Sequence, residues 1–126
     1  MRAVDTNILI RLLIRDDAQQ ADAADQFIEQ GAWVSILAVA EVMWVLRTEY
    51  RKNAAEVAAA VQMLIDHENL TLQDSEAVEA ALTLFRARPA LGFSDCLILH
   101  LARKAGHLPL GTFDRALARV EGVHKL

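Results

Sequence analysis

The sequence predicts a three-layer α/β domain in which helices flank a mostly parallel central sheet of four to five strands. Short apolar segments typical of buried strands alternate with longer segments whose apolar residues recur at helical spacing. This alternation is the pattern of βαβ units, which set their strands parallel and bring helices onto both faces of the sheet. No repeat, low-complexity segment or linker interrupts the pattern, so residues 1–126 are expected to form a single domain.

Five short segments carry the strand signal. Residues 3–5 end a brief apolar run at the N-terminus with Asp5, and residues 70–72 alternate apolar and polar side chains as a strand does. The predicted strands are residues 3–5, 32–35, 70–72, 109–112 and 122–124.

Helices are predicted between these strands. Arg11 and Arg15 are four residues apart with apolar residues on the other faces, which favours a helix over a strand in that segment. Asp16 and Ser94 are expected to cap two of the helices. Glycine or proline ends three of them, at Gly31, Pro89 and Gly106. The predicted helices are residues 8–15, 16–30, 36–50, 53–67, 74–88, 93–105 and 114–119.

Composition and charge exclude several classes of protein. Hydrophobic residues make up 54% of the chain, which argues against disorder. The longest apolar run, residues 32–46, contains Glu41 and is shorter than a membrane span, and the N-terminus does not resemble a signal peptide. A soluble cytoplasmic protein without a membrane partner is therefore expected. The net charge of −4 argues against general coating of nucleic acid but is compatible with a local basic rim. The single cysteine, Cys96, excludes an internal disulfide and a multi-thiolate metal site.

Four acidic residues stand alone in apolar surroundings. Asp5 is the only charge between residues 3 and 10, and Glu41 is the only one in residues 32–46. Asp95 lies within the apolar residues 91–99, and Asp114 directly follows residues 108–113. None of these windows contains a lysine or arginine. An ionised carboxylate removed from water is costly unless it is paired or coordinates a metal, so the four acids predict a shared cation site.

Each acid also has a simpler structural interpretation. Asp5, Asp95 and Asp114 lie at or near predicted helix N-termini, where a carboxylate accepts hydrogen bonds from free backbone amides. Glu41 falls inside a helix, where capping does not apply, and its simpler interpretation is an exposed stripe or a salt bridge to a distant arginine. Because capping does not explain Glu41, the four acids together favour a shared site over four separate structural roles.

Oxygen ligands alone favour Mg²⁺ or Mn²⁺ over Zn²⁺. Ligands of parallel α/β sheets bind at the carboxyl ends of the strands, where Asp5 and Asp114 are expected, and the four acids are predicted to converge on that rim. A metal ion there can generate hydroxide from bound water, and a second ion can stabilise the leaving oxygen. Glu41, in the most apolar setting of the four, is expected to be the most readily protonated without metal.

Other residues carry weaker signals. Arg11 and Arg15 share one helix face, which is either a solvated stripe or an edge that contacts phosphate. The same two interpretations apply to Arg47, Arg51 and Lys52. Four residues are expected in the hydrophobic core: Trp33, Trp44, Phe93 and Cys96.

Four motifs in this order and spacing together resemble a PIN domain, and the length and layout are most similar to the VapC-type toxins of toxin–antitoxin pairs. The motifs are Asp5-Thr6-Asn7, Glu41 in an apolar helix after Ser35, Phe93-Ser94-Asp95, and Gly111-Thr112-Phe113-Asp114.

This resemblance implies a PIN-like fold and a Mg²⁺- or Mn²⁺-dependent endoribonuclease, a hydrolase that acts on RNA. It implies that Asp5 and Asp95 are the main metal ligands and that Asp114 binds metal directly or through water. It also implies that Glu41 binds metal or orients the attacking water. A homodimer and a small cognate antitoxin protein that blocks the site are implied as partners. The family positions that support the acids by hydrogen bonds are matched by Thr6, Asn7 and Thr112.

Functions other than a nuclease fall into two classes, another Mg²⁺-dependent enzyme and a non-catalytic module. A Mg²⁺-dependent phosphatase of the haloacid dehalogenase type needs a second aspartate two residues after the first, and Asn7 stands there instead. A receiver domain needs a phosphoacceptor aspartate after a central strand and a later lysine, and neither is found. A non-catalytic PIN-like module that binds RNA or protein is the remaining alternative, and the four filled acidic positions argue against it.

Overall fold

The computed structural model describes residues 1–126 and divides into two compact units. Residues Met1–Ser75 form the first unit and residues Glu76–Leu126 form the second. No helix has the length and the apolar run that crossing a lipid bilayer requires.

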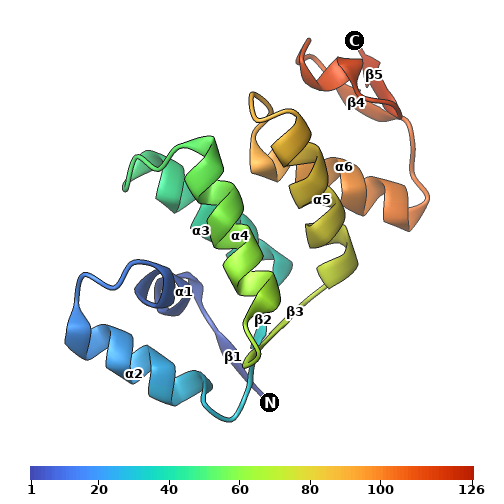
Figure 1. Ribbon diagram of the computed structural model, residues 1–126. Coiled ribbons are helices and arrows are strands. Elements are labelled where there is room, and N and C mark those ends of the chain that lie inside the picture. Colours follow the sequence, from blue (N-terminus) through green and yellow to red (C-terminus); the bar gives the residue numbers. More distant parts are fainter. The chain divides into compact units, whose positions relative to one another are not determined.

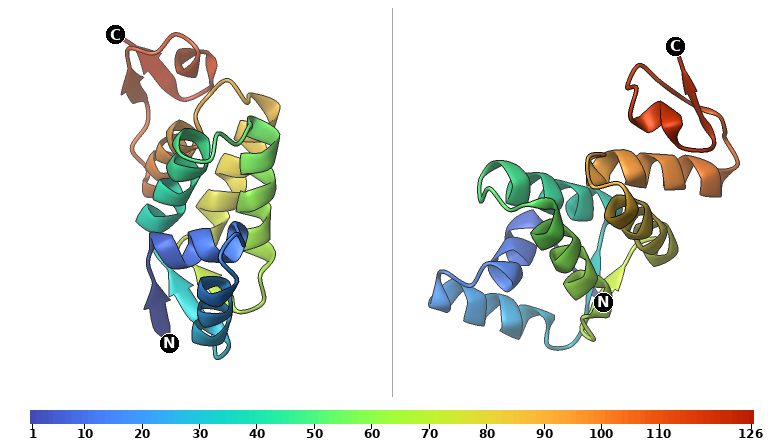
Figure 2. Two further views of the ribbon diagram at one scale, coloured as in Figure 1. Left: turned by 90° about the vertical axis from the view of Figure 1, so that its left-hand side faces the viewer. Right: turned by 45° about the horizontal axis from the view of Figure 1, so that its top comes forward.

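The first unit is a three-stranded parallel sheet with helical crossovers. Strands β1 (Arg2–Val4), β2 (Ala32–Val34) and β3 (Leu70–Leu72) lie side by side in that order (Figure 1). Helices α1 (Thr6–Leu13) and α2 (Ala18–Ile28) connect β1 to β2. Helices α3 (Ile36–Thr48) and α4 (Ala54–Asp66) connect β2 to β3, as Figure 2 shows from two further sides. These crossovers confirm the predicted βαβ pattern of parallel strands flanked by helices.

Side chains at the helix starts explain where these helices begin. The Asn53 side chain accepts a hydrogen bond from the Glu56 backbone N–H, and the Glu56 carboxylate accepts one from the Asn53 N–H, so α4 begins with a full capping box. Asp17 caps α2 through the Gln20 N–H at 3.0 Å. The expectation that Asp16 caps this helix is wrong, because Asp16 lies one residue too early and pairs with an arginine instead.

One face of the three-stranded sheet is buried and the other is exposed. The parallel register aligns Ala3, Trp33 and Thr71 in one row across the strands, and all three are exposed. Val4 and Val34, next along their strands, are buried. Side chains alternate between the faces of a sheet, so the core of this unit lies on the valine side. Trp33 is 38% exposed, and its predicted place in the core is therefore wrong.

The second unit contains two helices and a small sheet. Helix α5 (Ser75–Ala87) begins at the boundary and is followed by α6 (Phe93–Ala105). Phe85 of α5 and Phe93 of α6 meet edge to face, with ring centroids 5.9 Å apart, so Phe93 is a core residue as predicted. Gly106 ends α6 with φ +83°, a left-handed conformation that glycine adopts without steric cost.

The second sheet pairs the last two strands of the chain. Strand β4 (Leu110–Thr112) lies parallel to β5 (Val123–Lys125), and the 3₁₀ helix η1 (Leu117–Arg119) connects them. The predicted single sheet of four to five strands is therefore wrong: the chain has a three-stranded and a two-stranded sheet. All five predicted strands form, but strand pairing is set by long-range contacts that apolar patterning in the sequence does not encode.

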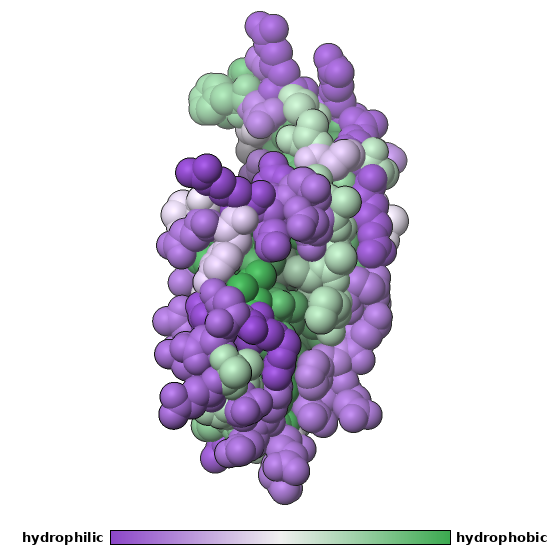
Figure 3. Space-filling view, turned by 60° about the vertical axis from the view of Figure 1, so that its left-hand side comes forward, coloured by the Kyte–Doolittle hydropathy of each residue, from purple (hydrophilic) through white to green (hydrophobic).

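The surface is largely polar but not uniformly so. The face drawn in Figure 3 is mainly hydrophilic, with apolar side chains showing in a depression near its centre. The first unit has an apolar hollow of about 200 Å³, which contains none of the four predicted site acids. Its lining residues are Leu13, Ile14, Leu46, Lys52, Glu56, Ala59, Ala60 and Met63.

Candidate functional site

Asp5 stands at the junction of β1 and α1. Its carboxylate accepts a hydrogen bond from the Ile8 N–H at 3.1 Å, so Asp5 is the N-cap of α1. Because Val4 pairs with Val34 in the parallel register, Asp5 and Ser35 follow neighbouring strands at the same edge of the sheet, with strands roughly 4.8 Å apart. The capping interpretation of Asp5 is confirmed, and its exposed side chain remains open to a second partner at this edge.

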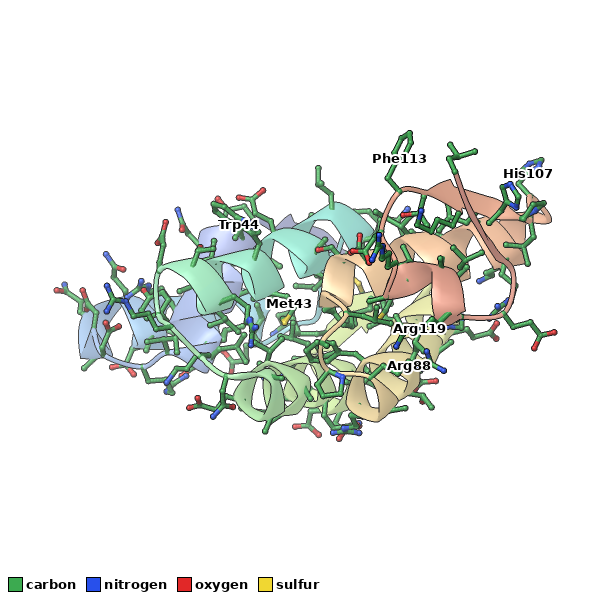
Figure 4. All side chains as sticks on the ribbon, turned by 90° about the horizontal axis from the view of Figure 1, so that it is seen from above. Met43, Trp44, Arg88, His107, Phe113 and Arg119 are labelled. Atoms are coloured by element: carbon green, nitrogen blue, oxygen red, sulfur yellow. The ribbon has the colours of Figure 1, made fainter.

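Glu41 lies on the exposed side of α3. Leu37, 72% exposed, and Trp44, 61% exposed, neighbour it on the same face of the helix. Figure 4 shows Trp44 pointing outward, whereas Met43, only 2% exposed, points inward. The predicted core position of Trp44 is therefore wrong, and Glu41 lies on an exposed stripe of α3, as its simpler interpretation predicted. Helix α3 carries more apolar residues than its buried face holds, so the surplus lies outside. No hydrogen bond or ion pair engages Glu41.

Asp95 lies in the first turn of α6 without acting as its cap. The N-cap residue is Gly92, no side chain caps this helix, and the predicted capping role of Ser94 is therefore wrong. The Asp95 carboxylate is half-buried and has no hydrogen-bond or ion-pair partner. Burial raises the pKa of Asp95, and the negative charge of Asp114 raises that pKa further. Asp95 is thus an unneutralised carboxylate held beside a second one.

Asp114 follows β4 and organises the turn into η1. Its Oδ1 atom accepts hydrogen bonds from the Ala116 N–H at 2.7 Å and the Leu117 N–H at 3.1 Å. The Asp114 backbone N–H donates a hydrogen bond to Thr112 Oγ1 at 3.0 Å, so Thr112 contacts the backbone of Asp114. Phe113, immediately before Asp114, is 80% exposed and projects outward (Figure 4). The simpler interpretation of Asp114 as a turn-forming residue therefore holds alongside any role in metal binding.

The four predicted site residues divide two and two between the units. Asp95 and Asp114 lie close enough in the second unit for their charges to interact, and Asp5 and Glu41 belong to the first unit. No group of three or more histidine, cysteine, aspartate or glutamate side chains is arranged to hold a metal ion. Convergence of all four acids therefore stays a prediction.

The other titratable side chains on α6 do not supply a competing chemistry. Cys96 is buried, and burial together with the charge of Asp95 raises the pKa of its thiol to about 11. The predicted core position of Cys96 is confirmed, and a neutral thiol at physiological pH is neither a nucleophile nor a good metal ligand. Burial lowers the pKa of His100, and the charge of Arg103 lowers it further, so His100 is neutral at pH 7.

The structure shows which arginines have partners within the chain and which are available to a substrate. Arg11 forms an ion pair with Asp16 at 2.8 Å, and Arg15 forms one with Asp25 at 2.6 Å, so both guanidinium groups already have partners within the chain. The sequence analysis missed three arginines of the second unit whose side chains have no hydrogen-bond or ion-pair partner. These arginines are Arg88, Arg115 and Arg119. Their proximity in sequence, within seven residues of Asp95 or Asp114, was the available signal.

Comparison with known families identifies the chain. The family model described as PIN domain matches residues 2–123, which include all four acids. This chain belongs to the PIN domain family. Searches of curated proteins and of solved structures found no match. PIN domains are generally nucleases that act on RNA and usually use divalent metal ions, so family membership favours a nuclease-type function for this PIN domain.

The donor set of this PIN domain fits a hard divalent cation. Asp95 and Asp114 offer carboxylate oxygens, the ligands that Mg²⁺ and Mn²⁺ prefer. The charge of Asp114 makes ionisation of Asp95 harder, and no cation of the protein offsets that repulsion. A divalent ion between the two carboxylates would relieve it.

Proposed function

We propose that this PIN domain is a Mg²⁺- or Mn²⁺-dependent endoribonuclease, with residues 1–126 acting as one domain and with Asp5, Glu41, Asp95 and Asp114 as its catalytic residues. The observation that carries the proposal is the unpartnered Asp95 carboxylate, whose pKa is raised by burial and raised further by the negative charge of the neighbouring Asp114. A structural role alone does not account for keeping two like charges together without a counter-charge.

Each acid has a distinct part in the proposed reaction. Asp95 and Asp5 would hold the metal ion, and Asp114 would hold it directly or through a water molecule. Glu41, exposed and without a partner, orients the attacking water. The hydrogen bonds from Ala116 and Leu117 fix one oxygen of Asp114 and leave its other oxygen free for the ion.

A divalent ion held by these residues would supply a lowered pKa for bound water and positive charge to stabilise the reacting phosphate. The protein residues supply position. Asp5 is held by the start of α1, and Asp114 by the turn before η1, so neither carboxylate needs to be ordered when substrate binds. The result is hydrolysis of an RNA phosphodiester bond.

The biological setting follows from the resemblance to VapC-type toxins. We propose that the chain is a cytoplasmic toxin, that it acts as a homodimer, and that a small antitoxin protein blocks the site. Arrest of growth on induction of the wild-type chain, and normal growth on induction of Asp95→Asn, would support the toxin role. Equal growth of both strains would contradict it.

The catalytic proposal is tested by cleavage of RNA with purified protein. Wild-type chain should cut with Mg²⁺ or Mn²⁺ and stop in excess EDTA, and Asp5→Ala should not cut. Asp22→Ala is the matched control, because Asp22 is an exposed aspartate on α2 outside the site. Cleavage that persists in EDTA or in Asp5→Ala would refute the proposal. Absence of cleavage by the wild-type chain would instead favour a non-catalytic binding module.

A further inference from the structure

The second unit has a hollow of about 350 Å³ that the four acids do not line. Its volume is at the lower end of the range of ligand pockets, roughly 300–1,000 Å³, and suits one nucleotide better than a folded partner. One wall comes from the segment between α5 and α6, and the other from the turn that leads through η1. The lining residues are Arg88, Pro89, Ala90, Leu91, Ala116 and Arg119.

The hollow combines two guanidinium groups with an apolar floor. Arg88 and Arg119 are exposed and reach it from opposite walls, and their side chains lie close together in Figure 4. Neither side chain has a hydrogen-bond or ion-pair partner within the chain. By contrast, Arg103 donates to the Glu121 carbonyl at 2.8 Å. Two unpartnered guanidinium groups at one hollow form a site suited to phosphate.

The charge of the chain is distributed to favour a polyanion at this unit. The second unit has seven Lys and Arg against five Asp and Glu, a formal charge of +2. The first unit has six against twelve, a formal charge of −6. Although the whole chain has a net charge of −4, the second unit, which contains the hollow, is positively charged.

The two segments that line the hollow are close in sequence to Asp95 and Asp114. Leu91 precedes Gly92, and that segment leads into the first turn of α6, where Asp95 lies. The Ala116 N–H, on the opposite wall, donates to Asp114. A nucleotide seated in the hollow therefore lies beside the segments that position both carboxylates of the second unit.

We propose that this hollow is a nucleotide subsite for single-stranded RNA, in which Arg88 and Arg119 bind backbone phosphates and the apolar floor contacts a base. The inference rests on the proposed endoribonuclease function and assigns that site its substrate-holding residues. Single-stranded RNA fits because its unstacked bases can enter a hollow of this size, whereas bases in a duplex are stacked away.

The test measures RNA binding separately from RNA cleavage. A fluorescein-labelled single-stranded RNA of mixed sequence is titrated with full-length protein in EDTA, so that no cleavage occurs, at several salt concentrations. The variants are Arg88→Gln, Arg119→Gln and the double variant. Lys125→Gln is the control, because it removes one positive charge from the same unit and does not line the hollow.

The double variant is expected to raise Kd by about tenfold or more and to lower the slope of log Kd against log salt by about 1.4, or 0.7 per phosphate contact. Lys125→Gln should change the slope little. In Mg²⁺, cleavage by the double variant should show a raised KM and an unchanged kcat. Unchanged Kd and slope in the double variant would overturn the subsite, as would absence of RNA binding by wild type. If binding depends on the two arginines but no cleavage occurs, the subsite stands and the nuclease proposal fails.

Discussion

Substitutions at Asp114 separate its structural role from its proposed role in metal binding. Asp114→Ala removes the acceptor of two backbone hydrogen bonds, from Ala116 and Leu117. Loss of such a cap costs about 1 kcal/mol, which corresponds to a fall in Tm of about 4 °C for a chain of this size. Asp114→Asn keeps an oxygen acceptor and removes only the charge. It also removes a repulsion that raises the pKa of Asp95, so its metal-free Tm should equal or exceed that of wild type.

The two variants should behave alike when metal is added. A ligand that binds only the folded chain stabilises it by about 2.7 kcal/mol at a hundred times Kd, which would raise the wild-type Tm by about 10 °C. Both Asp114→Ala and Asp114→Asn should lose most of this rise and most RNA cleavage. Thermal melting in EDTA and in Mn²⁺ measures both effects. A metal-free Tm equally low in both variants would refute the charge argument, and a full metal response in Asp114→Asn would refute the role in metal binding.

Three further outcomes are expected. Because the pKa of Asp95 is raised above its ordinary value near 3.8, the unfolded chain loses this proton first, and the contribution of Asp95 to stability falls as pH rises through its folded-state pKa. In metal-free urea titrations, the free energy of unfolding of Asp95→Asn should therefore exceed that of wild type by more at pH 7 than at pH 4. An equal difference at the two pH values would contradict this. Cys96, with a pKa of about 11, should react with iodoacetamide at pH 8 only after denaturation, and rapid native labelling would show that the thiol is accessible. Asn53→Ala should cost about 1 kcal/mol through loss of the capping box, with no change in the metal-induced rise in Tm; a reduced metal response would mean that α4 is coupled to the site.

Local chemistry in the sequence was sufficient to locate the strands and most of the helices, although the predicted helix at residues 114–119 is only the 3₁₀ helix Leu117–Arg119. All five strands form within about two residues of the predicted bounds, and Gly106 ends its helix as expected. These features depend on neighbouring residues, on apolar alternation and on the conformational freedom of glycine. The choice between Asp16 and Asp17 as a cap failed because both have the same side chain, and only the geometry of the turn decides between them.

Features that depend on long-range packing were not predictable. Trp33 and Trp44 are apolar enough for a core, but the register of β2 and the rotation of α3 leave both exposed. Glu41 is exposed for the same reason, and this exposure is what suits it to contact water or substrate. The partnership of β4 with β5 is likewise a consequence of three-dimensional contacts.

The surroundings of the four acids were predictable from the sequence only in part, and their assignment to one site stays a prediction. Isolation in sequence correctly singled out Asp95 as a carboxylate without a partner. The positions of Asp5 and Asp114 at predicted helix starts also indicated their capping and turn-forming hydrogen bonds, which the structure confirms. The sequence did not reveal Arg88 and Arg119, because whether an arginine has a partner depends on side-chain positions in three dimensions.

Binding of Mn²⁺, followed by the loss of the free-ion signal in electron paramagnetic resonance, tests the central claim most directly. The account predicts that wild-type chain binds Mn²⁺ and that affinity falls sharply both in Asp5→Asn, in the first unit, and in Asp95→Asn, in the second. Asp22→Asn should bind as wild type does. Wild-type affinity in Asp5→Asn, or no Mn²⁺ binding by the wild-type chain, would contradict the proposed role of Asp5 as a metal ligand.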